Sequence, residues 1–419
     1  MKRTVLTIAF WGVFLLAGAQ QRITLQECFD MAELNHPKYA QKSLLAESAA
    51  LQIENYKKDL LPQFFVNGKM SWQNEVIALP IDMPMLDIPE LSKDQYRLSL
   101  DVNQTIYRGN IYSKQKELEA LNQILLQLEV DKDLYYLKNN VKSLFFSIII
   151  LDEQKKIAES YQKQIEVKLK EFQAKQEEGV VLSSVLDGLR VEQLNVKQQL
   201  QEIKLSRASL LANLELLTKM ELGGVQELSV GDISIDGQEQ ERIEYKYLTA
   251  NQNKLEYSKQ LIDAKKMPTL SAFATGGIGR PGFNALSDDF SEFLMVGLNL
   301  NWKVFNWNRF NNQKKILDLN IQIIETEKTD FELNVQMALN KMQKEIDKFE
   351  NLLKDDPEMI RLRKNVADNA SHQLDQGVIT TSNYIDDLQK YHQAVINMKI
   401  HEVQLVNSKL DYLNVLGKL

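Results

Sequence analysis

Apolar and polar residues alternate along two similar stretches of the chain, residues 96–103 and 294–301. In the first stretch every second residue from Tyr96 to Val102 is apolar, and the residues between them are polar or charged. A period of two is typical of a β-strand with one apolar and one polar face. The pattern predicts amphipathic strands over residues 95–108 and 293–306.

Two further segments continue this pattern. Residues 62–76 carry Phe64, Val66, Met70 and Trp72 at alternate positions, and residues 268–279 form a weaker, glycine-rich version. The connector before residue 95 contains three prolines, which can neither continue a central strand nor build a helix, so it reads as a long loop. The sequence therefore predicts a four-stranded β segment.

Long helices follow the strands. After Gly109 the apolar period changes to alternating threes and fours, a spacing typical of coiled coils. If this helix continues to about Glu177 it has roughly 65 residues and a length of ~100 Å, longer than any globular core requires. Gly179 predicts the turn at which the chain reverses, with Ser183 or Ser184 capping a return helix over residues 185–219.

The second half of the chain repeats the first. Residues 20–220 and 242–419 share the order helix, two strands, long helix, glycine turn and return helix, with residues 221–241 as a linker and Gly377 in the place of Gly179. Asp356 followed by Pro357 resembles a helix start, which predicts that the second long helix is interrupted and restarted there. We expect a mainly α fold with two structural repeats.

The first residues predict export from the cytoplasm. Lys2 and Arg3 precede a short apolar run, and small residues follow at 17–19, so residues 1–19 read as a signal peptide. A membrane-anchoring helix is the alternative, but the run is shorter than the roughly 20 residues that span a bilayer. The single cysteine, Cys28, is expected to act as a small hydrophobe inside a helix. A formal net charge of −7 argues against a nucleic-acid partner.

Four strands with an apolar face cannot form a closed structure within one chain. In lipid the unpaired backbone groups of two open edges cost several kcal/mol each. Closure by several chains solves this problem, and aromatic residues at the strand ends suit the interfacial girdle of an outer-membrane barrel. The alternative is the core of a soluble sheet, because aromatic residues favour any strand. The candidate girdle residues are Trp72, Tyr96, Tyr107, Trp302, Phe305 and Trp307.

The chain resembles the TolC-like outer-membrane efflux protein family in the doubled order of its elements and in local segments. Residues 23–37 look like the family's opening helix and residues 60–64 like its helix-to-strand junction, while QTIYRGN and WKVFNWN look like its strand-to-helix junctions. The resemblance implies a homotrimer with a twelve-stranded transmembrane β-barrel continued by a long periplasmic α-helical barrel. It also implies a passive exit duct for efflux or type I secretion, which a periplasmic adaptor protein connects to an inner-membrane pump.

The resemblance assigns roles to three groups of residues. Polar strand residues would line the barrel lumen: Lys69, Arg97, Asp101, Asn103, Asn299 and Asn301. The turns between the long and return helices would contact the adaptor: Gly179, Val180, Ser183, Ser184, Gly377, Val378, Thr380, Thr381 and Ser382. The periplasmic aperture would be formed at Asn383, Asp386 and Asp387.

The aperture motif matches the family only in part. Asp386 occupies one of two acidic positions, Asn383 stands at the other, and Asp387 adds a neighbouring charge. Three copies of Asp386 near one axis would favour cations, whereas the alternative is a solvated acid on a helix surface. The family's basic residue is Ile379 here and its acid in the first half is Val185, so a salt-bridge latch is not expected at these positions.

The sequence contains no recognisable catalytic motif. The four histidines are scattered, and there is no HExxH, CxxC, phosphate-binding glycine–lysine loop or nucleophile elbow. We expect no enzyme activity, cofactor or metal. The competing interpretation is a periplasmic or secreted coiled-coil scaffold that binds partners without conducting solutes. It explains the long helices but not the four amphipathic strands.

Overall fold

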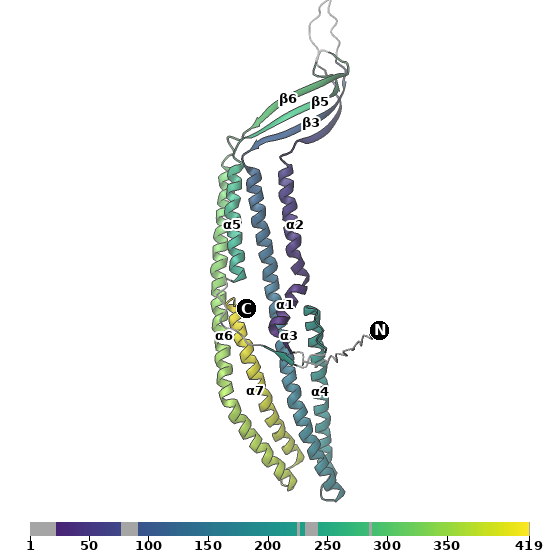
Figure 1. Ribbon diagram of the computed structural model, residues 1–419, viewed down its shortest axis with the longest axis vertical. Helices are drawn as coiled ribbons and strands as arrows, with labels where there is room; N and C mark the ends of the chain where they lie inside the picture. Colours follow the sequence, from purple (N-terminus) through teal and green to yellow (C-terminus); the bar gives the residue numbers. More distant parts are fainter. Residues whose placement is uncertain (1–21, 77–90, 224–226, 231–241, 285–286, 419) are drawn as a thin grey trace, which may run out of the picture. The chain divides into compact units, whose positions relative to one another are not determined.

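The computed structural model describes residues 22–76, 91–223, 227–230, 242–284 and 287–418 (Figure 1). The predicted signal peptide, residues 1–19, lies outside the described residues. The same is true of most of the predicted linker, residues 221–241.

The elements of the chain form two series of the same order, except that the first series begins with two helices and the second with one. The first series is α1 (Leu25–Asn35), α2 (Pro37–Lys58), β2 (Gln63–Trp72), β3 (Asp94–Arg108), α3 (Ile111–Glu177) and α4 (Ser183–Thr218). The second is α5 (Ile243–Ala264), β5 (Thr269–Arg280), β6 (Ser291–Asn301), α6 (Arg309–Asp375) and α7 (Thr381–Val415). The long helices α3 and α6 each have 67 residues. This arrangement confirms the mainly α fold with two structural repeats.

The chain forms two compact units, and each draws on both repeats. One unit contains residues 1–39, 133–240 and 335–419, and the other contains residues 40–132 and 241–334. We call them the helical unit and the sheet unit. The long helices α3 and α6 contribute to both.

The sheet unit holds four antiparallel strands in the order β2-β3-β5-β6. Two strands are shorter than the sequence predicts, since β2 ends at Trp72 rather than residue 76 and β6 at Asn301 rather than residue 306. Asn301 pairs with Thr269, the first residue of β5, so no partner strand remains beyond it. The backbone turns there instead, and the Val304 amide donates to the Trp302 carbonyl.

Left-handed residues connect the strands to the long helices in both repeats. Gly109 and Asn110 have φ angles of 58° and 59°, and Trp307 and Asn308 have φ angles of 52° and 61°. A Cβ atom added at Gly109 would lie 2.5 Å from the Ala264 carbonyl oxygen. The left-handed angle favours glycine at position 109, and the close approach of the end of α5 excludes any larger residue there.

The helical unit is held together by a core to which both repeats contribute. Tyr161, Ile165 and Phe172 of α3 pack in this cluster with Leu186 and Leu189 of α4. The second repeat adds Ala367, Ala370 and Leu374 from α6 and Tyr384 and Leu388 from α7. Apolar positions at coiled-coil spacing thus pair the two helical hairpins with each other.

The start of the chain also packs in the helical unit. Thr24 caps α1 in a capping box with Glu27, and a short strand β1 (Arg22–Thr24) pairs in parallel with β4 (Glu227–Ser229). Cys28 is fully buried, as expected, and burial raises the pKa of its thiol to about 12. The sequence analysis did not identify β1, because three residues are too few to show a period.

The predicted interruption at Pro357 is wrong, because α6 runs through it without a break. Proline removes only one backbone donor from a long helix, and the surrounding turns hold the helical geometry. The side chain of Asp356 does not cap a new helix. Its Oδ2 lies 2.7 Å from Nδ1 of His401 in α7, so it links two helices instead.

Candidate functional site

One face of the sheet carries the polar residues that the sequence predicted to line a lumen. The strand register places Lys69 opposite Arg97, and Gln63 opposite Asn103. Asn103 of β3 pairs with Phe273 of β5. Ser271 lies two residues before Phe273, and therefore on the same face, and it pairs with Asn299 of β6. Asp101 accepts hydrogen bonds from Asn67 and, at 3.2 Å, from Ser99. The six predicted lumen residues therefore share one face.

The opposite face is apolar and exposed. Val66 pairs with Leu100, which pairs with Gly276, which in turn pairs with Leu294, so the apolar face continues across all four strands. The exposed fraction is 74% for Val66 and 74% for Leu294. Such a continuous apolar surface indicates contact with another protein or with lipid.

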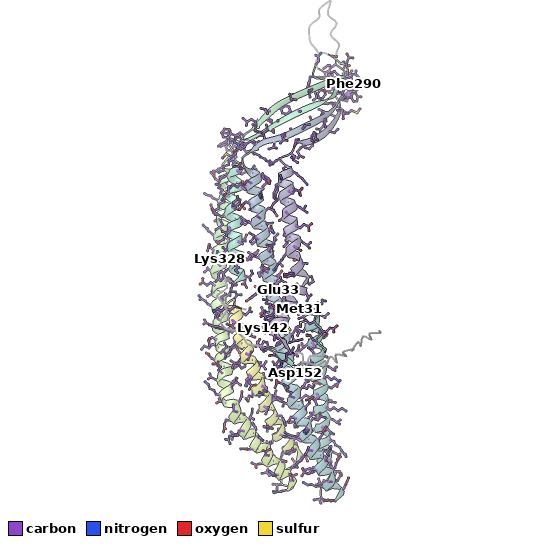
Figure 2. All side chains as sticks on the ribbon, viewed as in Figure 1. Met31, Glu33, Lys142, Asp152, Phe290 and Lys328 are labelled. Carbon is purple, nitrogen blue, oxygen red and sulfur yellow. The ribbon has the colours of Figure 1, made fainter. Side chains whose placement is uncertain are left out.

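The predicted girdle residues fall at the two ends of the sheet. Trp72 and Tyr96 lie at the end that carries the strand-connecting loops. The ring centroid of Tyr96 is 6.1 Å from that of Phe290, and Figure 2 labels Phe290 at this end of the sheet. Tyr107, Trp302, Phe305 and Trp307 lie at the end from which the helices leave. Trp302 and Phe305 follow β6 rather than belonging to it, which corrects their predicted place in a strand.

The two helix tips have the same backbone geometry. Gly179 and Gly377 adopt φ angles of 78° and 73°. The amides of Val180 and Val378 each donate to a carbonyl five residues back, while the glycine amides donate three residues back. These bonds form the Schellman motif that satisfies the last carbonyls of a helix. Val180 and Val378 are exposed at the tips, with exposed fractions of 73% and 68%.

The starts of the return helices differ. Neither Ser183 nor Ser184 caps α4, since its N-cap is Leu182 and makes no side-chain hydrogen bond. In α7 the N-cap is Thr380, whose Oγ1 accepts from the Asn383 amide at 3.3 Å. Thr381 is buried next to Gly188 of α4, where any Cβ atom would lie 3.2 Å from its methyl group. Ser382 is exposed.

Comparison of the sequence with protein-family models and with curated proteins finds no match. Solved structures of outer-membrane channels, in contrast, match nearly the whole chain. The CmeC outer membrane channel of Campylobacter jejuni matches with a TM-score of 0.67 and 15% identity over 94% of this chain and 85% of that chain. The outer membrane protein VceC of Vibrio cholerae matches with a TM-score of 0.67 and 9% identity over 94% and 96%. A membrane protein from Pseudomonas aeruginosa matches with a TM-score of 0.68 and 11% identity over 99% of this chain and 96% of that chain.

The chain has the fold of the TolC-like outer-membrane channels. The described part of this chain supplies to the fold a four-stranded antiparallel sheet and two pairs of long helices. The sequence-based fold class is therefore confirmed.

Within the TolC-like fold of this chain, the predicted aperture residues lie in the first turns of α7. Asn383 and Asp386 are exposed and Asp387 is half-buried. Asp386 forms an ion pair with Lys390, one turn further along the helix. The paired lysine reduces the negative potential that Asp386 would otherwise contribute.

Ion pairs that the sequence analysis missed join the two repeats near the tips. Lys168 of α3 is buried and donates to both carboxylate oxygens of Asp375 in α6, at 2.7 and 2.9 Å. Lys175 donates to the same carboxylate at 3.3 Å. Burial raises the pKa of Asp375, but the bonds and charges of the two lysines outweigh it and hold the pKa below its ordinary value. The pairing positions lie 207 residues apart, so no local pattern could have predicted them.

A buried polar network lies further along the same helices. Glu192 of α4 accepts from the Tyr161 hydroxyl at 2.6 Å and from Gln389 of α7 at 2.8 Å. The ring of His392 lies 4.7 Å from that of Tyr161, and its Nε2 is 3.2 Å from Gln164. Burial lowers the pKa of His392 to about 4, so this imidazole is neutral at pH 7. The network borders a cavity of about 350 Å³ that Asp386 and Lys390 also line.

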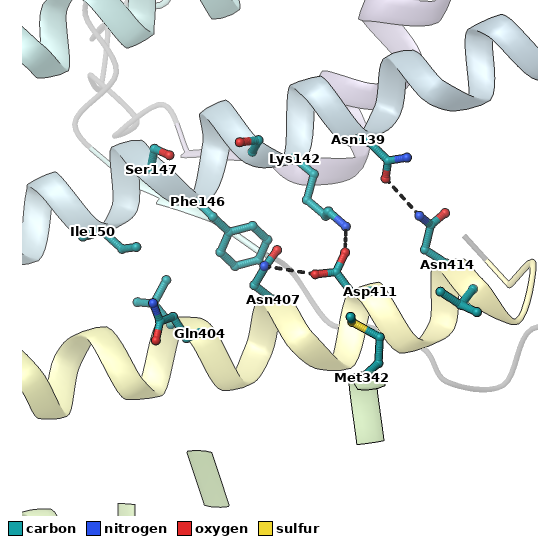
Figure 3. A pocket seen from close by; sticks show the side chains of 13 residues that line it. Asn139, Lys142, Phe146, Ser147, Ile150, Met342, Gln404, Asn407, Asp411 and Asn414 are labelled. Atoms are coloured by element: carbon teal, nitrogen blue, oxygen red, sulfur yellow. Dashed lines mark hydrogen bonds and ion pairs between the residues drawn. The ribbon is translucent and has the colours of Figure 1, made fainter. Parts of the chain in front are cut away.

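A larger polar cavity of about 570 Å³ separates α3 from α7 (Figure 3). Lys142 of α3 forms an ion pair with Asp411 of α7, and Asn407 donates to the same carboxylate at 3.2 Å. Asn414 donates to Asn139 at 2.9 Å. These bonds join the first repeat to the second, so the cavity belongs to the seam that holds the helices of the fold together.

None of the helices in the described ranges combines the length and the apolar composition needed to cross a membrane. Among the same residues, no group of three or more histidine, cysteine or acidic side chains is placed to hold a metal ion.

Proposed function

We propose that this chain is the outer-membrane exit duct of a tripartite efflux or type I secretion system, a passive conduit from the periplasm to the outside. Its position would be the outer membrane, with a periplasmic extension. The proposal includes a homotrimer, a periplasmic adaptor protein and an inner-membrane pump as partners, with no nucleic acid and no enzyme activity.

The observation that carries the proposal is the four-stranded sheet with an exposed apolar face and two open edges. β2 and β6 are the edge strands, and among the strands of the described residues each has a partner on one side only. Because an even number of strands alternates in direction, β2 of one chain runs antiparallel to β6 of the next. Three chains can then close a twelve-stranded antiparallel barrel that leaves no edge exposed to lipid.

The helix tips support the proposed contact with the adaptor. Val180 and Val378 form an exposed apolar point at each tip, on a backbone that the Schellman bonds hold rigidly. A protein partner would bury this apolar surface, which stabilises a contact by roughly 25 cal/mol per Å². Crosslinking from residues 378–382 in cells would identify the adaptor and, through it, the pump.

Fractionation tests the duct against the soluble scaffold. The duct must partition with outer membranes, require detergent for extraction and crosslink as a trimer. A soluble monomer in the periplasm would contradict the proposal and favour the scaffold.

Conductance tests the aperture. In planar bilayers, replacing Asp386 with Asn should reduce the preference for cations, and replacing the exposed Glu358 with Gln serves as the control. The same ion selectivity in the native chain and in Asp386→Asn would exclude Asp386 from the aperture.

A further inference from the structure

The polar face of the sheet carries an uneven distribution of charge. Only four of its strand residues are charged: Lys69, Arg97, Asp101 and Arg108. The remaining charged strand residues, Asp94, Arg280 and Glu292, fall in register with the apolar face. The polar face is therefore net positive, although the chain as a whole is acidic.

Two of the positive charges are direct neighbours across strands. Lys69 of β2 pairs with Arg97 of β3, and side chains at such positions have Cβ atoms about 4.5–5.5 Å apart. Like charges in this arrangement repel each other, and a sheet that needs only a polar surface would gain stability by placing an acid at one of the two positions. Within the described part of the chain, no hydrogen bond or ion pair neutralises either side chain.

The nearest acid on that face is already bound. Asp101 lies four residues further along β3, about 13 Å at the rise of a strand. Its carboxylate accepts from Asn67 and Ser99. These partners are neutral, so Asp101 keeps its charge and attracts Arg97, which offsets the two positive charges of Lys69 and Arg97 only in part. The pair remains a local positive excess, close to the loop end of the sheet.

Aromatic rings hold the guanidinium of Arg97 in place. Its Cζ lies 5.0 Å from the ring centroid of Phe293 and 5.7 Å from that of Phe283, and the two rings are 4.7 Å apart. Phe293 lies over Gly277, its cross-strand partner, where an added Cβ would be 2.9 Å from the ring. The glycine lets the ring of Phe293 lie flat on the sheet, where it is buried, so Arg97 and the exposed ring of Phe283 lie side by side above it.

We propose that Lys69, Arg97, Phe283 and Phe293 form a binding site for organic anions, a carboxylate, sulfonate or phosphate attached to an aromatic or apolar body, in the outer part of the lumen. This inference rests on the proposed function, because that function places the polar face inside a barrel. Three chains would then supply six cations at one level of the lumen. An anion there is attracted by several charges at once, and its apolar part covers the exposed ring of Phe283, which Phe293 supports from below.

Single-channel recording in planar bilayers tests the site with two probes of matched shape, 1-naphthalenesulfonate and 1-naphthylmethylammonium. We expect the sulfonate to block the native channel at lower concentration than the ammonium ion. In Lys69→Gln/Arg97→Gln the half-blocking concentration of the sulfonate should rise about tenfold, equivalent to about 1.4 kcal/mol. The chloride-to-potassium permeability ratio should fall in the same variant.

Two matched variants control the experiment. Lys69→Arg keeps the charge and should keep both properties. Glu292→Gln removes a charge next to Phe293 but on the opposite face of the sheet. It should change neither the block by the sulfonate nor the permeability ratio. A shift in Glu292→Gln as large as in the double variant would overturn the assignment of the faces.

The outcomes separate the site from the duct. A double variant that conducts like the native chain, with unchanged block and permeability ratio, overturns the anion site and leaves the proposed function standing. A native chain that forms no channel and is extracted without detergent overturns both.

Discussion

Single residues fix the backbone where strands, helices and tips meet. Gly109 and Gly179 both adopt left-handed angles, yet their surroundings differ. A Cβ at Gly109 would lie 2.5 Å from the Ala264 carbonyl oxygen, whereas a Cβ at Gly179 would meet no atom within 4 Å. Substitutions at the two glycines therefore distinguish the free-energy cost of a left-handed backbone angle, which applies at both, from the cost of a steric clash, which applies only at Gly109.

We predict that Gly109→Ala lowers the thermal stability of the detergent-solubilised protein far more than Gly179→Ala. The Gly179 change costs about 1 kcal/mol for the backbone angle alone. The Gly109 change costs more free energy, because the added Cβ atom must also displace the end of α5. Unfolding followed by circular dichroism measures both, and equal losses would contradict the close approach at Gly109.

The buried His392 makes the helical unit sensitive to acid. Its pKa of about 4 lies below the ordinary value of 6.5, so the folded form binds the proton less readily than the unfolded form does. The stability is complete above pH 6.5 and declines as the pH falls toward 4. At pH 5 the expected loss is about 2 kcal/mol.

We predict that His392→Gln reduces this acid sensitivity between pH 7 and pH 5. The exposed His372→Gln is the matched control and should behave as the native chain does. Thermal unfolding across this pH range measures the difference. Glu192, Asp386 and Lys390 border the same cavity and remain in both variants. An unchanged pH profile in His392→Gln would show that another group causes the loss.

At the scale of elements, α3 and α6 are joined across the repeats by the Lys168–Asp375 ion pair. Lys168 also lies 5.6 Å from the ring of Phe172 and 5.9 Å from that of Tyr384. Its ammonium group has two counter-charges, Asp375 and, at 3.2 Å, Glu171. Removing Asp375 leaves Glu171 as the remaining acid for both Lys168 and Lys175, which is more costly than removing Lys168 and Asp375 together.

We predict that Asp375→Asn destabilises the tips by about 2 kcal/mol, because Lys168 and Lys175 then share Glu171, and that Lys168→Met/Asp375→Leu recovers most of that loss. The matched control Glu358→Gln, which breaks an exposed pair with Arg361, should have little effect. Hydrogen exchange of the amides in residues 367–388 measures the loosening. A double variant no more stable than Asp375→Asn would contradict the charge argument.

At the scale of the whole molecule, the sheet has two edge strands, β2 and β6, which the proposed trimer would join into a closed barrel. Its apolar face is exposed across all four strands, and neighbouring residues on β6 point to opposite faces. Leu298 belongs to the apolar face, with an exposed fraction of 67%, and Asn299 belongs to the polar face. This adjacent pair can report which face meets lipid.

We predict that Leu298→Arg strongly reduces the amount of trimer in the outer membrane, whereas Asn299→Arg is tolerated. An arginine on the lipid face costs about 2–4 kcal/mol near the bilayer midplane, in each of the three chains. Quantitative immunoblotting of outer-membrane fractions measures the effect. The reverse order of the two variants would show that the sheet is oriented the other way.

The sequence by itself determined the elements and their repetition. Period two at residues 96–103, coiled-coil spacing after Gly109 and the glycines at 179 and 377 are local signals, and a local signal directly reflects backbone geometry. For the same reason, the polar and apolar faces of the strands could be assigned before the register was known. The local signals failed at Pro357, where a helix-start pattern lies inside a continuous helix, and at residues 302–306, where a strand pattern has no partner strand.

Only the tertiary structure decided which distant residues meet. The Lys168–Asp375 pair, the network around Glu192 and the Lys69–Arg97 neighbours each depend on register or packing between segments far apart in the chain. Such side chains give no periodic signal, because a lysine or glutamate occupies the same kind of position in the sequence pattern whether it faces solvent or a partner helix. The physical reason is that periodicity records which face of an element is buried, whereas the identity of the partner is fixed only when two faces pack together.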